Sequence, residues 1–278
     1  MTFFSTPERI EIGGVPFIAS HEKPTRRDGL LYYRRVAEHF GLDARPGEEV
    51  TSVTRVDERF ELAVKRRHDS TRYTADNVVF ATGYYDWPNR LGIPGEDLPH
   101  VAHYFTEGHR HWHQRVVVIG GGNSAVDAAL ECWRAGAHVT MVHLGDRFDG
   151  TVKPWVLPDI TNRLKEKSII GKWRSRVVAI TAEVVEIVAD DGCRETLPAD
   201  YVLAMTGYYA DTGLIETLGV PVDAGTGIPA HDEKTMMTPV PGCYLAGVMA
   251  SGKDANRLFI ENARGHGELI VKDVLRGR

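Results

Sequence analysis

The clearest pattern of apolar and polar positions lies in the middle of the chain. The β-branched run Val116–Ile119 is typical of a strand that is buried on both faces. Gly120–Gly122 then predicts a turn, and apolar residues recur at helical spacing over Ser124–Ala135, after which Gly136 ends the helix. A second β-rich run follows at His138–His143. This order of strand, glycine turn, helix and strand predicts the first unit of a parallel sheet.

A second pattern repeats within the chain. Residues 75–85 (ADNVVFATGYY) and 199–209 (ADYVLAMTGYY) are identical at seven of eleven positions. Each is a short apolar strand that ends in Thr-Gly, and each follows a β-rich region, Glu49–Lys65 or Val177–Ala189. A chance match of two buried strands is the alternative, and the shared Thr-Gly-Tyr-Tyr argues against it. The repeat predicts two nucleotide-binding domains of similar build.

The repeat also predicts where a second glycine loop belongs. In the second copy, Gly207 follows the glycine turn at Gly120 by a fixed number of residues. The same number of residues counted back from Gly83 reaches a position before Met1. No G-x-G-x-x-G occurs among residues 1–100. We therefore expect the chain to be truncated at its N-terminus, by a late start or by loss of the first βαβ unit.

The other segments indicate that the first domain is discontinuous. Residues 85–114 are rich in Pro, His and charge and are typical of a crossing between domains. The chain is then expected to return through a short strand that shares a sheet with Val78–Gly83, and through a long helix capped by Asp254. These two elements are Cys243–Ala246, which ends at Gly247, and Asp254–Leu275. We predict an α/β fold of two Rossmann-like domains, with residues 113–211 inserted into a domain of residues 1–112 and 212–278.

Composition narrows the class of protein. The 278 residues are 42% hydrophobic and 26% charged, which excludes disordered, collagen-like and disulfide-scaffold proteins. The net charge of −5 is spread along the chain, so we expect no nucleic-acid partner. The apolar runs are too short for a membrane helix, and the N-terminus does not resemble a signal peptide. We therefore expect no membrane partner. Cys132, Cys193 and Cys243 form no C-x-x-C pair and suit a reducing compartment, so we expect a cytoplasmic protein.

Candidate chemistry begins at the glycine turn, where Gly120-x-Gly122-x-x-Ala125 follows a strand and opens a helix. In dinucleotide-binding folds the first glycine permits the tight turn and the second lets the backbone approach the pyrophosphate. The third position allows close packing of helix and strand. Asn123 and Ser124 begin the helix, whose free N–H groups favour phosphate. The alternative is a glycine turn that serves another ligand in a Rossmann-like domain.

The end of the second strand indicates which nicotinamide cofactor binds. NAD-binding domains usually place a carboxylate there for the ribose 2′-hydroxyl. Here His143 stands at that position and Arg147 follows, so we expect both to bind the 2′-phosphate of NADPH. The neutral Leu144 and the acidic Asp146 stand where further cations would help. The alternative is that His143 and Arg147 belong to a solvated loop.

Distinctive short stretches run from one end of the chain to the other. They are Phe3–Ser5, Ala81–Asp86, Ile93–Pro99, Val118–Gly121, Val126–Glu131, Lys153–Trp155 and Phe259–Asn262. With them the chain resembles the bacillithiol-disulfide reductase family of thioredoxin-reductase-like pyridine-nucleotide disulfide oxidoreductases. The resemblance implies an FAD domain that is split in sequence by an inserted NADPH domain. It also implies a further N-terminal segment that holds the FAD glycine loop.

The resemblance implies, too, which residues contact FAD. The strand end Ala81-Thr82-Gly83 would pass near the cofactor, and the backbone of Val50 would contact the adenine. Gly247 and Val248 match the late flavin motif, although the wider superfamily has an acid at the position of Val248. Gly207, in the Thr-Gly of the second copy of the repeat, is a further cofactor-binding candidate. An ordinary strand-to-helix turn at Gly247 is the alternative that the residues alone would favour.

Neither catalysis nor metal binding is assigned to a particular side chain. Two of the cysteines suit packed small hydrophobes and the third lies in an expected turn, so no catalytic residue is named. His109, His111 and His113 could place three imidazoles on one face of a strand. A closed zinc site needs four ligands and usually has other spacings, so we favour a polar loop between domains and no metal.

Three functions fit these observations. The first is an NADPH-dependent flavoprotein that reduces a small-molecule disulfide of the bacillithiol type. Whether it forms a homodimer is left open. The second is an NADP(H)-binding module without flavin, and the third is an inactive fragment. We expect the truncated chain to bind NADPH and to hold FAD weakly, because its only glycine turn is assigned to NADPH. Flavin absorbance of the purified protein separates the first function from the other two.

Overall fold

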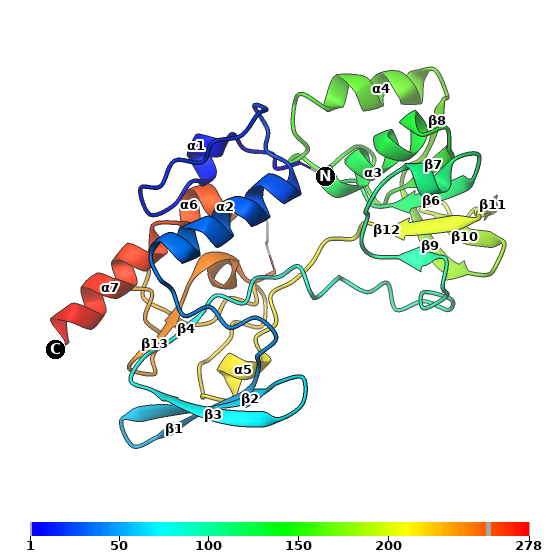
Figure 1. The fold of residues 1–278 in the computed structure, drawn as a ribbon. Helices are drawn as coiled ribbons and strands as arrows, with labels where there is room; N and C mark the ends of the chain where they lie inside the picture. Colours follow the sequence, from blue (N-terminus) through cyan, green and yellow to red (C-terminus); the bar gives the residue numbers. More distant parts are fainter. Residues whose placement is uncertain (1, 254–256, 278) are drawn as a thin grey trace. The chain divides into compact units, whose positions relative to one another are not determined.

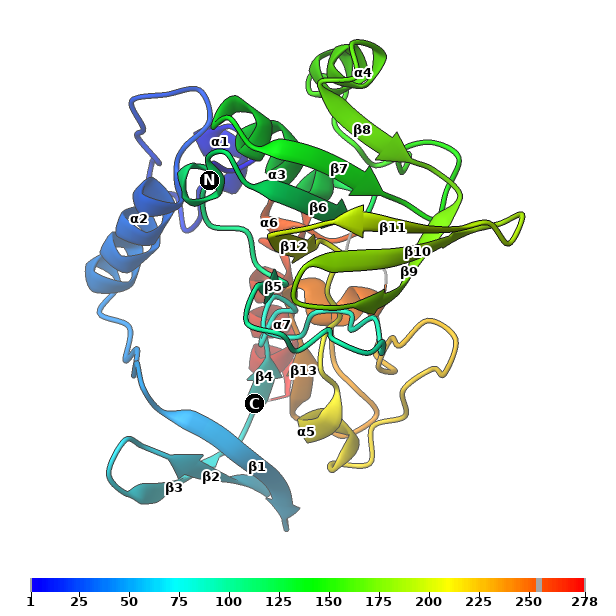
Figure 2. The same ribbon diagram turned by 90° about the vertical axis from the view of Figure 1, so that its right-hand side faces the viewer.

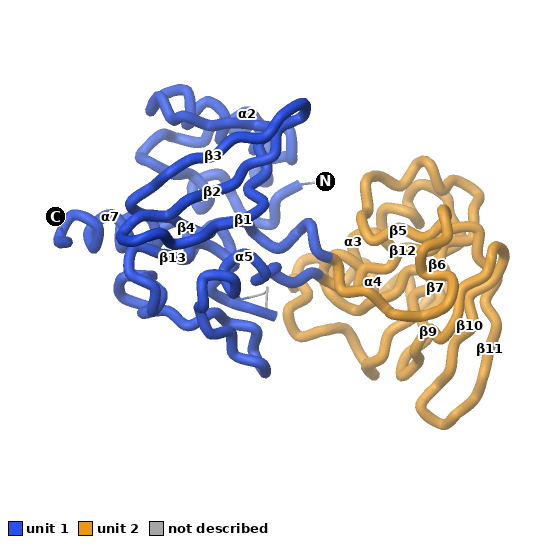
Figure 3. The backbone as a smooth tube through the Cα atoms, turned by 90° about the horizontal axis from the view of Figure 1, so that it is seen from below, with its two compact units in different colours: residues 1–87, 208–278 blue, residues 88–207 orange. Residues whose placement is uncertain are grey.

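The computed structural model of the protein describes residues 2–253 and 257–277. It divides into two compact units, residues 1–87 with 208–278 and residues 88–207, which Figure 3 draws in blue and orange. The sequence placed the two boundaries later, at 112/113 and 211/212. Residues 88–112 pack with the second unit because β5 (Val101–Ala102) pairs with a strand of its sheet.

Unit 2, residues 88–207, is built on a five-stranded parallel sheet of order β5-β12-β6-β7-β8. Its other elements outside the antiparallel sheet are β6 (Arg115–Ile119), α3 (Asn123–Arg134), β7 (His138–Val142), α4 (Leu157–Lys165), β8 (Ile169–Lys172), β12 (Tyr201–Ala204) and a 3₁₀ helix, η1 (His109–His111). The predicted strand, glycine turn, helix and strand are confirmed as β6, α3 and β7 (Figure 1). The strand order reverses between β6 and β12, and open α/β sheets bind ligands at the carboxyl ends of strands beside such a reversal.

Each face of this parallel sheet has its own core. On one face lies an antiparallel sheet of β9 (Ser175–Ile180), β10 (Val184–Ala189) and β11 (Arg194–Pro198), seen beside β6 in Figure 2. There Ile180 and Val185 pack in one cluster with Val117 of the parallel sheet. The other face is covered by α3, whose side chains Val126 and Leu130 are fully buried. The apolar periodicity that predicted α3 therefore corresponds to a buried helix face.

Unit 1, residues 1–87 with 208–278, has a similar plan, in which an antiparallel sheet is followed by a strand of a smaller parallel sheet. An antiparallel sheet of β1 (Glu49–Val56), β2 (Arg59–Lys65) and β3 (Ser70–Ala75) precedes β4 (Val78–Phe80). The late strand β13 (Cys243–Leu245) pairs in parallel with β4, and this confirms the prediction that the two segments share a sheet. The helices are α1 (Pro7–Ile10), α2 (Arg26–His39), α5 (Gly213–Glu216), α6 (Ile260–Ala263), α7 (His266–Arg276) and a 3₁₀ helix, η2 (Gly247–Ser251).

The internal repeat corresponds to equivalent structure in the two units. In each unit a three-stranded antiparallel sheet comes directly before the repeated strand, which is β4 in unit 1 and β12 in unit 2. Gly83 and Gly207 follow these strands with φ of 75° and 83°, a backbone conformation that favours glycine. The shared Thr-Gly therefore marks the same turn in both units.

One predicted helix is wrong in its extent. The sequence indicated a single helix over residues 254–275, but the structure has two, α6 and α7, which are separated at Arg264 and Gly265. Gly265 is the N-cap of α7, and glycine within a helix weakens it because its backbone loses more conformational freedom on folding. The Arg264 guanidinium donates to the Glu8 and Glu11 carbonyls and so holds this break against the N-terminal segment. The proposed N-cap Asp254 lies outside the described residues.

In each unit, the residues next to the two crossings between the units lie close together. In unit 2 the Asn89 N–H donates to the Gly207 carbonyl at 2.9 Å. In unit 1 the Tyr209 N–H donates to the Trp87 carbonyl at 3.0 Å. The first and last residues of unit 2 are therefore neighbours, and so are the residues of unit 1 between which unit 2 is inserted.

Candidate nucleotide-binding sites

The glycine turn between β6 and α3 has the backbone that the sequence predicted for a dinucleotide site. Gly120 has a φ of 132°, and a methyl group placed on it would lie 2.4 Å from the Met205 carbonyl oxygen. The same methyl group would lie 3.3 Å from the Cβ of Ala125, which is fully buried. Met205 follows β12, so the turn lies where the strand order reverses. Only glycine fits at position 120, and only a small residue fits at position 125.

The N-terminus of α3 is arranged to receive an anion. Gly122 is the N-cap, and no side chain among the described residues caps this end of the helix. The first amides of a helix have no partners within it and carry partial positive charge, so they favour phosphate. Ser124, in the first turn of α3, is exposed. The backbone from Gly122 to Ser124 can therefore hold a pyrophosphate.

Asn123 has a different role from the one that its position predicts. Its side-chain amide nitrogen donates to the Thr151 carbonyl, and its side-chain oxygen accepts from the Lys153 N–H, each at 2.9 Å. The side chain thus fixes the loop before α4 to the start of α3. Only its backbone N–H is left for a ligand by these contacts.

This loop also places Asp149 beside the glycine turn, which the sequence did not indicate. The Asp149 N–H donates to the Gly121 carbonyl at 3.0 Å. Its Oδ2 atom lies 3.2 Å from a methyl group placed on Gly122. A carboxylate next to a phosphate site opposes an anionic ligand unless it is paired, and Asp149 Oδ1 lies 3.5 Å from His143 Nε2. No local motif could have revealed this contact.

The two residues expected at the 2′-phosphate have different surroundings. The His143 ring is mostly buried and packs over the glycine turn, where a methyl group on Gly121 would lie 2.4 Å from its Cε1 atom. It also meets the Trp173 ring edge-on, with 6.0 Å between centroids. Arg147 instead has a side chain that is 89% exposed, with Nε 3.8 Å from Asp146 Oδ1. Phosphate binding by these two residues stays a prediction. Of the two side chains, that of Arg147 is the more accessible to a ligand.

In unit 1 the structure brings together most of the residues that the resemblance assigned to FAD. Because β4 and β13 are parallel neighbours, Ala81–Gly83 and Gly247–Val248 leave the sheet at the same edge. The Thr82 hydroxyl donates to the Met249 sulfur at 3.1 Å and links the two strand ends. Val50 lies in the antiparallel sheet at an irregularity in the pairing of β1 with β2. Gly207 belongs to unit 2, so it is not part of this group.

A histidine that the sequence did not single out supports this strand end. The Gly247 N–H donates to Nδ1 of His266, the first residue of α7, at 3.2 Å. Gly247 has a φ of 67°, so the chain turns sharply here into η2. Burial, and then the nearby His231, lower the pKa of His266, which favours the neutral ring that can accept this bond. His266 therefore holds the turn after β13.

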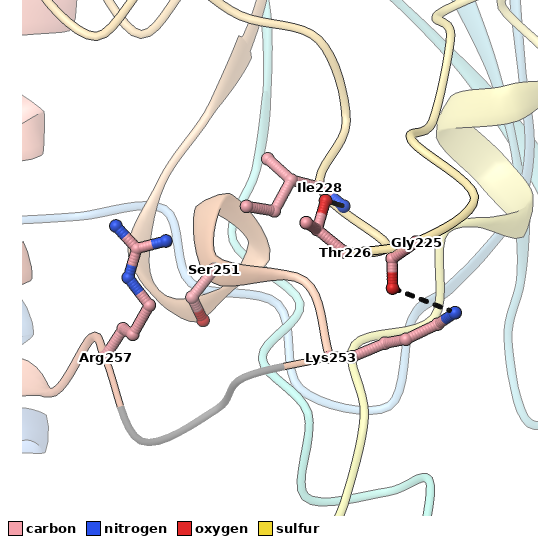
Figure 4. A pocket seen from close by; sticks show the side chains of 6 residues that line it. All are labelled: Gly225, Thr226, Ile228, Ser251, Lys253 and Arg257. Atoms are coloured by element: carbon pink, nitrogen blue, oxygen red, sulfur yellow. Dashed lines mark hydrogen bonds between the residues drawn. The ribbon is translucent and has the colours of Figure 1, made fainter.

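Unit 1 also contains a cavity of about 430 Å³ at the far end of η2 (Figure 4). Its lining residues are Gly225, Thr226, Ile228, Ser251, Lys253 and Arg257. The Lys253 ammonium donates to the Ala224 carbonyl at 2.8 Å, and Arg257 extends from the other side of the cavity. Since η2 begins at Gly247, the cavity is one short helix away from the candidate flavin contacts.

The cysteines and the histidine-rich segment do not form a reactive site. Burial raises the pKa of the Cys132 thiol to about 12 and also raises that of Cys243, so both stay protonated and unreactive. Cys193 is exposed in the turn between β10 and β11. His109–His111 forms η1, so the alternative of three imidazoles along a strand is wrong. Across the described part of the chain, no group of three or more His, Cys, Asp or Glu side chains is arranged to hold a metal ion.

No helix within residues 2–253 and 257–277 combines the length and the apolar character that crossing a membrane requires.

Asp127 gives α3 a measurable dependence on pH. Burial, and then the neighbouring Glu131, raise the pKa of Asp127 to about 6. The fold thus favours the protonated form, whose stabilising contribution is complete below the unfolded pKa near 3.8 and is lost as the pH rises through 6. Asp127→Asn should therefore raise the free energy of unfolding by about 1–2 kcal/mol at pH 8, and by almost nothing near pH 4.

Urea unfolding across this pH range measures the effect. Asp190→Asn, in the exposed turn after β10, is the matched control and should change little at any pH. A difference between the Asp127→Asn variant and the unsubstituted chain that is the same at both ends of the range would contradict the assignment.

Comparisons with known proteins agree with this architecture. The model of the family described as "Pyridine nucleotide-disulphide oxidoreductase" matches residues 1–247. A curated relative, bacilliredoxin reductase Bdr of Bacillus subtilis, is 42% identical over 278 residues, which cover 99% of this chain and 84% of that protein.

Solved structures are similar over almost the whole chain. The bacillithiol disulfide reductase Bdr of Bacillus cereus has a TM-score of 0.97 and 40% identity, and the match covers 100% of this chain and 86% of that one. Thioredoxin reductase of Lactococcus lactis has a TM-score of 0.75 at 20% identity, covering 97% and 86%, and shows the shared fold alone. The predicted α/β fold with two Rossmann-like domains is confirmed. The chain belongs to the pyridine nucleotide-disulphide oxidoreductase family, with which its glycine turn and its two sets of parallel strand ends are consistent.

Proposed function

We propose that the protein is an NADPH-dependent flavoprotein that reduces the disulfide of a low-molecular-weight thiol of the bacillithiol type. The observation that carries this is the glycine turn at Gly120, which lies at the strand reversal of unit 2 and opens an uncapped helix. In the overall reaction one NADPH and one proton reduce one disulfide bond to two thiols and leave NADP⁺. The names of the relatives in Bacillus subtilis and Bacillus cereus support this chemistry.

The residues of unit 2 fit a dinucleotide. The amides from Gly122 to Ser124 would bind the pyrophosphate, and Gly120 and Ala125 keep the backbone close enough for that contact. Arg147 is available to the adenosine ribose. Unit 2, residues 88–207, is then the NADPH domain.

The residues of unit 1 fit part of a flavin site. Ala81–Gly83 and Gly247–Val248 would hold the flavin end at the carboxyl edge of β4 and β13, and the Val50 backbone would meet the adenine. His266 keeps the Gly247 turn in place. FAD, when bound, supplies the two-electron carrier between nicotinamide and disulfide, and the protein supplies its orientation.

The names of the relatives differ in what is reduced. The protein from Bacillus cereus is named for a small-molecule disulfide, whereas the one from Bacillus subtilis is named for bacilliredoxin, itself a protein. We favour the small disulfide, and a bacilliredoxin is the second candidate substrate.

Steady-state oxidation of NADPH by the purified chain tests the proposal. The chain is assayed with and without added FAD, against bacillithiol disulfide, glutathione disulfide and a bacilliredoxin carrying a mixed disulfide. We expect FAD-dependent turnover that is fastest with bacillithiol disulfide and releases two thiols for each NADPH. Turnover confined to the bacilliredoxin would favour the second candidate. NADPH binding without flavin binding or thiol release would overturn the proposal in favour of a flavin-free module.

The flavin content of the chain is measured in the same preparation. FAD that stays bound through purification, or that binds when added, supports the flavin assignment of unit 1. A chain that binds no FAD under either condition would overturn that assignment.

A further inference from the structure

The loop after β7 lacks a cation at the position where one would be most useful. In dinucleotide-binding folds the end of this strand meets the ribose of the adenosine. Leu144 is the first residue of the loop beyond His143, and it is neutral and 69% exposed. The His143 ring is turned over the glycine turn. Among residues 144–148, the part of the loop that directly follows His143, Arg147 is therefore the cation that remains for a phosphate on the ribose.

A second strand connection supplies another cation at this place. The turn between β8 and β9 contains Arg174, whose N–H donates to the Gly145 carbonyl at 2.9 Å. The next residue, Ser175, donates its N–H to the His143 carbonyl at 3.0 Å. These bonds fasten the backbone of Arg174 to the loop after β7, although the two segments are far apart in sequence.

One carboxylate lies close to both guanidinium groups. Arg174 Nη2 lies 3.5 Å from Asp146 Oδ2, and Arg147 Nε lies 3.8 Å from Asp146 Oδ1. The three side chains are between 57% and 89% exposed. Ion pairs this exposed are weak, so an anion of higher charge can displace the carboxylate. Two arginines with one aspartate leave an excess positive charge at the site.

We propose that Arg174 joins Arg147 in binding the 2′-phosphate of NADPH, and that Asp146 keeps the two guanidinium groups together while competing with that phosphate. The inference rests on the proposed function, because it deepens the assignment of unit 2 as the NADPH domain. Arg174 takes the role that Leu144 cannot fill. A guanidinium suits this task because its fork of N–H donors matches phosphate oxygens.

Direct binding measurements test Arg174 without reference to catalysis. Dissociation constants for NADPH, NADH, 2′,5′-ADP and 5′-AMP are measured by calorimetry. Arg174→Asn is the main variant because asparagine tolerates the φ of 48° at this position. It should weaken NADPH and 2′,5′-ADP about 5- to 20-fold and leave NADH and 5′-AMP unchanged. Arg147→Ala should behave similarly, and Arg174→Lys should retain part of the affinity.

Two further variants make the assignment specific. Arg176→Ala removes an exposed arginine from β9 only two residues away, and it should change NADPH affinity less than twofold. Asp146→Asn should tighten NADPH about two- to fivefold, because the competing carboxylate is lost.

The results separate this inference from the proposed function. Equal losses for Arg174→Asn and Arg176→Ala, or equal losses of NADPH and NADH, would overturn it. A chain that prefers NADPH through Arg174 and yet reduces no disulfide would leave this inference standing while the proposed function fails. A chain that binds neither dinucleotide would overturn both.

Discussion

Replacing Gly120 by alanine is expected to abolish measurable NADPH binding and to lower the free energy of unfolding of unit 2 by about 2–4 kcal/mol. The φ of 132° at this residue is unfavourable for any side chain. The added methyl group would also lie 2.4 Å from the Met205 carbonyl oxygen, so β6 and β12 would have to separate. The backbone that faces the pyrophosphate would move with them. Urea unfolding and NADPH calorimetry measure the two effects.

Gly150→Ala is the matched control in the same unit. A methyl group at that residue would meet none of the described atoms within 4 Å, so we expect the stability and NADPH affinity of the unsubstituted chain. Equal behaviour of the Gly120→Ala and Gly150→Ala variants would mean that the turn does not need its glycine.

The second large effect is expected at Glu96, a carboxylate that is only 5% exposed. It accepts hydrogen bonds from the N–H groups of Leu91 and Gly92, at 2.7 and 2.8 Å. Its Oε1 atom lies 3.3 Å from His103 Nε2. Glu96→Ala leaves the N–H groups of Leu91 and Gly92 without the buried carboxylate that accepts from them, and it should lower the free energy of unfolding by about 3 kcal/mol.

Asp97→Asn tests whether position or charge causes the loss at Glu96. Asp97 is the next acid in the chain, and its side chain is 86% exposed. Its removal should cost less than about 1 kcal/mol, since exposed ion pairs contribute little. Chemical denaturation of both variants decides the matter, and similar losses would show that the buried bonds of Glu96 are not what stabilises this loop.

The parts that the sequence predicted are those with local signals. The glycine turn, α3 and the strands beside it lie within one continuous stretch, where apolar periodicity and glycine positions determine each element. The repeat was equally informative, because Gly83 and Gly207 occupy the same turn in the two units. The pairing of β13 with β4 was predicted from the expected return of the chain to the first domain, although the two strands are far apart in the chain.

The parts that the sequence missed depend on contacts between distant segments. Arg174 reaches the loop after β7 only because the turn between β8 and β9 is fastened there by backbone bonds. Asp149 lies beside the glycine turn because Asn123 fixes its loop. His266 supports Gly247 from a helix whose start the sequence placed elsewhere. No residue spacing and no local composition in a single sequence predicts any of these contacts.

The adjacent ends of unit 2 have a consequence for how such a gene can change. Asn89 and Gly207 are hydrogen-bonded neighbours, and Trp87 and Tyr209 are neighbours in the same way. The coding segment for residues 88–207 can therefore be deleted, with a very short linker joining the flanking residues. It can also be replaced by another domain whose first and last residues lie close together. Neither half has to stretch or refold to allow the exchange. The same geometry lets one ancestral nucleotide-binding domain be copied into a loop of itself, which the shared Thr-Gly-Tyr-Tyr of the two units suggests.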